Sequence, residues 1–152
     1  MKIEMCGKDI YNIFINREYL KGKDYSVKED IVKVVKEIIF KLRGRLGLRG
    51  FYKIKVFPQK IIGIFLEVIK LDETEFSNSL DLRIITYMDE KFYFETDDYF
   101  KIANCNDKRY IDGHFYCVVD DNFDLVLEKV EFGRFIYGKD VNFLLNNSLI
   151  LW

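Results

Sequence analysis

Few residues of this 152-residue chain are of the types that catalyse reactions or bind metal ions. His114 is the only histidine, and the three cysteines are Cys6, Cys105 and Cys117. A structural zinc site usually takes four Cys or His ligands at paired spacings, and this set offers no such pairs. His114 and Cys117 lie three residues apart on a predicted strand, so their side chains point to opposite faces, which disfavours a catalytic dyad. We therefore expect no catalytic residue, no metal site and no cofactor, with a metal site at Cys105, His114 and Cys117 as the minor alternative.

Phosphate-binding loops are also missing from the sequence. Neither the dinucleotide-binding glycine pattern nor the P-loop pattern occurs. Gly44, Gly47 and Gly50 are spaced by three, but they follow a predicted helix, whereas a phosphate-binding loop precedes one. We accordingly expect a protein that is not an enzyme.

The cysteine pattern and the first residues indicate a cytoplasmic protein. The number of cysteines is odd, their spacing is wide, and no C-x-x-C motif occurs. Charges in residues 1–6 interrupt any apolar signal segment. No apolar run approaches the length of about 18 residues that a transmembrane helix needs. We expect free thiols in a reducing cytoplasm, and no membrane partner.

Charge is segregated along the chain, although the formal net charge is only -1. Residues 33–60 hold nine basic residues and one acidic residue, whereas residues 72–131 hold sixteen acidic and six basic residues. Arg and Lys neutralise phosphates, and Phe51 or Tyr52 could stack on a base. The alternative is that these cations form only the solvated face of a helix and of an edge strand. The candidate residues for binding a nucleic acid or an acidic partner are Lys36, Lys41, Arg43, Arg45, Arg49, Lys53 and Lys55.

Aromatic residues make up 16% of the chain and favour a protein-binding surface, because Tyr and Phe provide a large contact area at low entropic cost. The alternative is that alternate aromatic residues fill the core of the second half. Self-association as a dimer is also compatible with unpaired edge strands and with the apolar tail at residues 149–152. The candidate contacts for a protein partner are Phe92, Phe94, Phe132, Arg134 and Trp152.

The elements that position these residues are clearest in the first half. Ser26 and Glu29 form a capping-box pattern at the start of a predicted helix. Apolar residues then repeat on one helical face up to Gly44 and Gly47, where the helix should end. We predict an α+β fold whose first domain, residues 1–71, is a ββαββ unit with one helix on an antiparallel sheet. Apolar periodicity places its strands at residues 1–6, 10–16, 51–57 and 61–71.

The second half is predicted to be rich in short strands. Residues 72–79 are polar and acidic, and they form a long loop or short linker in this interpretation. Asp112-Gly113 lies between aromatic strands and predicts a hairpin, because Gly accepts the positive φ of a type I′ turn. A last strand is expected at residues 128–137 and a short helix at residues 139–145. Residues 80–152 then form a strand-rich half, either separate from the first domain or packed with it as one unit.

Five segments of the first half follow one another in a recognisable order, namely Met1–Glu4, Ile10–Ile15, Ser26–Asp30, Phe51–Phe57 and Gly63–Val68. In this order they resemble the N-terminal domain of the MecA-type adaptors of the Clp protease machinery. The resemblance implies that this domain holds a client protein.

The second half is similar in outline to the C-terminal part of the same family. Arg109–Val119 resembles its aromatic hairpin, and Val130–Tyr137 followed by Val141–Leu145 resembles its closing strand and helix, where the family carries a similar E-[YF]-G element. The resemblance implies docking on a AAA+ unfoldase.

The function expected from the sequence is therefore that of a non-enzymatic, macromolecule-binding protein. It resembles an adaptor or regulator that links a client protein to a AAA+ protease machine. The alternative is a factor that binds nucleic acid or ribonucleoprotein through residues 33–60, including a small inhibitor of a host or rival nucleoprotein complex.

Overall fold

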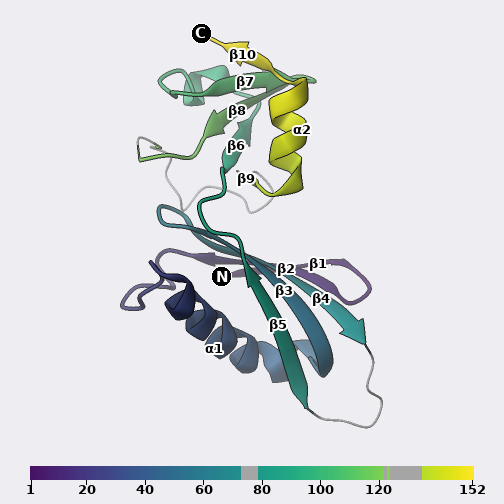
Figure 1. The fold of residues 1–152 in the computed structure, drawn as a ribbon. Helices are drawn as coiled ribbons and strands as arrows, with labels where there is room; N and C mark the ends of the chain where they lie inside the picture. Colours follow the sequence, from purple (N-terminus) through teal and green to yellow (C-terminus); the bar gives the residue numbers. More distant parts are fainter. Residues whose placement is uncertain (73–78, 122, 124–134) are drawn as a thin grey trace. The chain divides into compact units, whose positions relative to one another are not determined.

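The computed structural model describes residues 1–72, 79–121, 123 and 135–152. The chain forms two compact units, residues 1–89 and residues 90–152, each built around its own five-stranded sheet (Figure 1). The described residues form two α-helices, one short 3₁₀ helix and ten strands. This arrangement confirms the predicted α+β class.

The first unit is a mixed sheet with a single helix. Its strand order is β1-β2-β4-β3-β5, with antiparallel pairing except between β3 and β5, which run parallel. The strands are β1 (Lys2–Gly7), β2 (Ile10–Asn16), β3 (Gly50–Gln59), β4 (Gly63–Asp72) and β5 (Leu80–Thr86).

The helix α1 (Lys28–Leu46) packs along one face of this sheet (Figure 1). Its apolar face is buried as the sequence predicted, because residues spaced by three and four lie on one side of a helix. Gly47 ends the helix with a φ of 63° and donates its N–H to the Arg43 carbonyl, so the predicted glycine terminus is confirmed. The buried contacts join Ile31, Val34, Val35, Ile38, Ile39 and Leu42 to Ile13, Ile15, Tyr52, Ile54, Val56, Ile64, Leu66 and Val68.

The start of α1 differs from the predicted capping box. The residue before the helix is Val27, and no side chain caps the first turn. Instead, the backbone N–H and the hydroxyl of Ser26 both donate to the Asp24 carboxylate, at 3.1 Å and 2.8 Å. Asp24 thus accepts the Ser26 N–H, which the Glu29 carboxylate would accept in a capping box.

The first unit extends beyond the predicted boundary at residue 71, because it includes a fifth strand. Residues 80–86 were assigned to the second half, but β5 pairs with β3 and completes the first sheet. Leu82 and Ile84 of β5 pack against the same core as α1. The pairing joins strands that are not neighbours in sequence, and apolar periodicity alone does not reveal such a partner.

The second unit is an antiparallel sheet in the order β10-β7-β8-β6-β9. Asp112 and Gly113 join β7 to β8 with φ values of 51° and 85°, which confirms the predicted hairpin turn. The predicted strand at residues 128–137 lies mostly outside the described residues, and its described part is β9. The elements are β6 (Tyr93–Thr96), η1 (Tyr99–Lys101), β7 (Lys108–Ile111), β8 (His114–Val118), β9 (Phe135–Ile136), α2 (Lys139–Asn147) and β10 (Leu149–Leu151).

The helix α2 covers one face of this second sheet. Val141 and Leu144 of α2 are buried with Tyr93 of β6 and Tyr116 of β8. Side chains alternate along a strand, so Phe115 of β8 lies on the face that α2 does not cover.

Candidate functional site

Two of the three cysteines form a disulfide, which corrects the prediction of free thiols. Cys105 and Cys117 are bonded to each other, with their Cα atoms 5.9 Å apart. The hairpin explains the pairing, because the β7–β8 register sets Lys108 opposite Cys117 and brings the chain just before β7 against β8. Cys6 is the free cysteine of the structure, and it is exposed.

The disulfide also bears on the minor metal hypothesis. Thiolates are the metal-binding form of cysteine, and a sulfur held in a disulfide does not offer one. His114 instead places its Nδ1 atom 2.6 Å from the Asp97 carboxylate. Across the described ranges, no group of three or more His, Cys, Asp or Glu side chains is arranged to hold a metal ion.

A row of aromatic rings crosses the face of the second sheet opposite α2. The ring centroids of Tyr110 and Phe115 are 5.2 Å apart, those of Phe115 and Tyr99 are 5.6 Å apart, and those of Tyr99 and Phe100 are 6.4 Å apart. At the other end of the row, Tyr110 is paired with Leu149 of β10. We call these five residues the aromatic surface.

Both ends of the aromatic surface are open to solvent. The side chain of Phe100 is 87% exposed and that of Leu149 is 66% exposed, whereas the three tyrosine and phenylalanine rings between them are half-buried. Large apolar side chains exposed together on one face mark an interaction site more often than isolated ones do.

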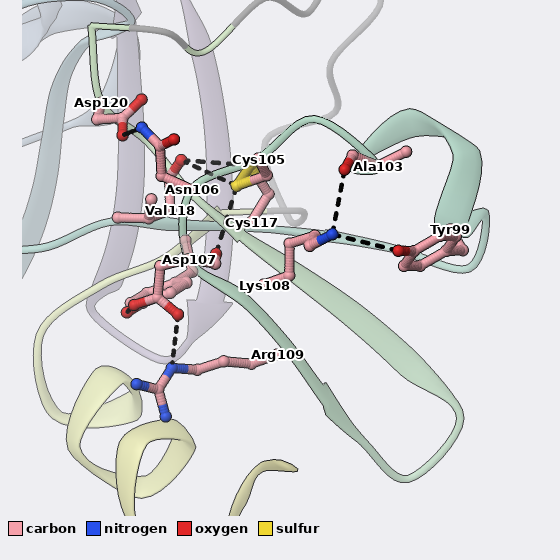
Figure 2. Close-up of a disulfide and its surroundings, with 11 residues drawn as sticks. Tyr99, Ala103, Cys105, Asn106, Asp107, Lys108, Arg109, Cys117, Val118 and Asp120 are labelled. Atoms are coloured by element: carbon pink, nitrogen blue, oxygen red, sulfur yellow. Dashed lines mark hydrogen bonds and ion pairs between the residues drawn. A yellow bond between two sulfur atoms is a disulfide. The ribbon is translucent and has the colours of Figure 1, made fainter. Parts of the chain in front are cut away.

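The disulfide and Lys108 fix the loop that carries half of this surface (Figure 2). Cys105 ties the segment after η1 to β8. The Lys108 ammonium donates to the Tyr99 hydroxyl at 3.2 Å and to the Ala103 carbonyl at 3.1 Å, and it also lies 5.4 Å from the centroid of the Tyr99 ring. These contacts hold Tyr99 and Phe100 on the sheet, so the loop loses little conformational freedom when a partner binds.

Buried tyrosine–carboxylate contacts stabilise the opposite face of the same sheet. The Tyr93 hydroxyl donates to Asp107 at 2.6 Å, and the Tyr116 hydroxyl donates to Glu95 at 3.0 Å. Burial, together with the bond to Asp107, raises the pKa of Tyr93 to about 12. Burial and the bond to Glu95 likewise raise the pKa of Tyr116. Both phenols therefore stay neutral and act as structural donors near neutral pH.

The edge strand β10 lies beside the aromatic surface. Leu149 and Ile150 point to opposite faces of the sheet, and both are exposed. In the described part of the chain, β10 pairs only with β7, so its outer edge carries no strand. Trp152 follows β10 and is fully exposed.

The five predicted protein contacts differ in whether the structure describes them and in how exposed they are. Phe92 and Phe94 are buried, and Phe94 packs on Phe135 with the ring centroids 5.7 Å apart, so these two rings belong to the core and not to a surface. Phe132 and Arg134 lie outside the described residues. Trp152 is the predicted contact that the structure leaves accessible.

The seven predicted basic residues do not form one surface. Lys36, Lys41 and Arg45 are exposed on α1. Lys53 and Lys55 alternate with the buried residues of β3 and therefore lie on the sheet face opposite α1. The remaining two are Arg43, half-buried in the last turn of α1, and Arg49, exposed in the segment before β3.

Sequence reasoning missed three accessible residues of interest. Phe40 is 50% exposed between the lysines of α1, and Leu149 was treated only as part of a tail. Arg83 is exposed on β5 and faces Lys53 across the β3–β5 pairing. The parallel pairing of β5 is what makes Arg83 relevant, and no local signal in the sequence marks it.

Comparison of the chain with protein-family models, curated proteins and solved structures finds no match in any of the three. Among the described residues, no helix has both the length and the apolar character needed to cross a membrane.

Proposed function

We propose that this chain is a non-enzymatic protein-binding factor, which resembles an adaptor or regulator that links a client protein to a AAA+ protease machine. The observation that carries the proposal is the aromatic surface of the second unit, which is open at Phe100 and Leu149. It is bordered by the edge of β10 that pairs with no strand among the described residues.

The chemistry of this surface suits an apolar protein segment. An extended segment can add to an exposed strand edge through backbone hydrogen bonds, while pockets or rings beside the edge select its side chains. Here β10 supplies the edge, and Leu149, Tyr110 and Phe115 supply apolar contacts next to it. Aromatic residues in such positions carry a large share of the binding energy of protein interfaces.

A purified Clp-type AAA+ unfoldase from the same organism provides the direct test. We expect a complex whose dissociation constant rises at least tenfold in the Phe100→Ala/Leu149→Ala variant, since loss of a large apolar contact that becomes buried on binding costs about 2 kcal/mol. Phe40→Ala is the matched control, because Phe40 is also an exposed aromatic residue but lies on α1. Equal affinity of the double variant and the unchanged protein contradicts the proposed surface.

The adaptor role implies a cytoplasmic location, and the disulfide offers a test of it. Disulfides are rare in the cytosol and are mostly redox-active there. Trapping thiols by alkylation during acid quenching of growing cells measures how much of the Cys105–Cys117 pair is bonded. A mainly reduced pair supports the cytoplasmic location, whereas a fully bonded pair contradicts it.

A further inference from the structure

The β3–β5 pairing places two like charges side by side. Lys53 of β3 and Arg83 of β5 are direct partners in the parallel register. Neighbouring strands lie about 4.8 Å apart, and paired residues project to the same face. Like charges directly opposite each other destabilise a sheet, so this arrangement works against the stability of the first unit.

The face that carries this pair is the one that α1 does not cover. Tyr52, Ile54 and Leu82 belong to the core beneath α1, and Lys53 and Arg83 alternate with them. Lys55 lies two residues further along β3 on the same face as Lys53. Within the described residues, no ion pair joins these three cations to an acidic side chain.

Glu67, Asp81 and Glu4 are acidic residues on this same face. Glu67 is the register partner of Lys55, and both Asp81 and Asp72 are register partners of Phe51. Glu4 of β1 pairs with Asn12, which in turn pairs with Glu67. None of these four acidic residues is a register partner of Lys53 or Arg83. The paired cations remain the point on this face where an anion would relieve repulsion.

An aromatic ring lies next to the paired cations. Phe51 is two residues before Lys53 on β3, so both side chains project from the same face of the strand. Its side chain is 36% exposed. Phe51, Lys53 and Arg83 lie on the accessible part of this face, whereas Phe57 and Phe65 on the same face are buried. A ring beside cations on an accessible part of a sheet is the arrangement by which proteins stack a base and hold the neighbouring phosphate.

We propose that Phe51, Lys53, Lys55 and Arg83 bind single-stranded nucleic acid, with a phosphate bridging Lys53 and Arg83 and a base stacked on Phe51. Arg and Lys together suit a phosphate, because the guanidinium donates two parallel hydrogen bonds and the ammonium adds a compact charge. A double helix would use the cations but not the ring, since its bases are already stacked. We call these four residues the sheet-face site.

Fluorescence anisotropy of the whole protein with a labelled single-stranded oligonucleotide tests the site, with one arm of RNA and one of DNA. We expect the Lys53→Gln/Arg83→Gln variant to bind at least tenfold more weakly. The plot of log affinity against log salt concentration has a negative slope, and its magnitude should decrease by about 1.4, because each phosphate contact on a single strand contributes about 0.7. The matched control is Lys28→Gln/Lys33→Gln, which removes the same charge from exposed positions of α1.

The ring is tested separately from the charges. Phe51→Ala should weaken binding about tenfold with little change in the salt slope, because stacking releases no counterions. Phe51→Trp should restore binding. Phe40→Ala on α1 is the matched control and should bind as the unchanged protein does.

A measurement of thermal stability separates weaker binding caused by a lost contact from weaker binding caused by unfolding. Removing the like charge at Arg83 should leave the thermal midpoint of Arg83→Gln equal to or above that of the unchanged protein, so weaker binding cannot come from unfolding. Binding of either RNA or DNA with this pattern supports the proposal. Equal loss in the α1 control, tighter binding of a duplex, tighter binding of an acidic peptide, or no binding of either oligonucleotide would each overturn it.

Discussion

At the scale of single residues, two glycines of the first unit should respond to the same substitution in opposite ways. Gly63 has a φ of 135°, and a Cβ atom there would collide with the carbonyl oxygen of Ile15 on β2. Gly44 lies within α1 with open space around its Cα atom. We expect Gly63→Ala to lower the free energy of unfolding by about 3 kcal/mol or more.

Gly44→Ala is the control and should raise the same free energy by about 0.5–1 kcal/mol, since Gly is a poor residue in a helix interior. Urea denaturation followed by circular dichroism measures both changes. A neutral Gly63→Ala variant would show that β2 and β4 can separate at this point at no cost.

A second residue-scale prediction concerns alkaline pH. The pKa of Tyr93 is raised to about 12 in the folded protein by burial and by its bond to Asp107, above the value of about 10 for an exposed tyrosine. The folded state then holds a proton that the unfolded state has lost, so stability is complete below pH 10 and declines as the pH rises from 10 to 12.

Tyr93→Phe removes the titrating hydroxyl, so folding stability should decline less steeply above pH 10. The variant also loses the hydrogen bond to Asp107 at every pH. Denaturant midpoints measured from pH 8 to pH 11.5 test the difference in slope. The control is Tyr110→Phe in the same unit, because Tyr110 lies on the sheet face that α2 does not cover. Parallel pH profiles of the Tyr93→Phe variant and the unchanged protein would contradict the prediction.

At the scale of elements, the disulfide should stabilise the hairpin and the loop before it. The bond spans 12 residues, and closing a loop of this length stabilises a fold by roughly 3 kcal/mol in the chain-entropy model. We expect the Cys105→Ser/Cys117→Ser variant to lose about that much, with faster hydrogen exchange at residues 97–107.

The aromatic surface provides a functional measure of the same change. Once the loop is loosened, Tyr99 and Phe100 must be ordered again on binding, so partner affinity should fall in the double serine variant. Cys6→Ser is the control because Cys6 is exposed and belongs to β1 of the other unit. A double variant with unchanged exchange at residues 97–107 would mean that Lys108 alone holds the loop.

The elements also show where sequence reasoning succeeds and where it stops. The bounds of β2, the glycine end of α1 and the turn at Asp112-Gly113 follow from local patterns that the chain satisfies within a few residues. The partner of β5 and the Cys105–Cys117 bond depend on segments that meet only after folding. Local patterns are silent on both.

At the scale of the whole molecule, each unit has its own buried core and should therefore respond alone to a local perturbation. The core around α1 uses only residues of the first unit, and the core around α2 uses only residues of the second. Gly63→Ala should speed hydrogen exchange in β2 and β4, whereas loss of the disulfide should speed it in β7 and β8. Hydrogen exchange with mass spectrometry on the whole chain resolves these segments in one experiment.

Combining the two changes in one chain gives the sharper measurement. Perturbations that share no partners add to within about 0.5 kcal/mol, so the Gly63→Ala/Cys105→Ser/Cys117→Ser variant should show the sum of the separate effects, each in its own strands. Faster exchange of β7 and β8 in Gly63→Ala alone, or of β2 and β4 in the disulfide variant alone, would mean that the two cores unfold as one cooperative unit. In that case, a nucleic acid on the sheet-face site and a protein on the aromatic surface would influence each other's affinity through folding stability.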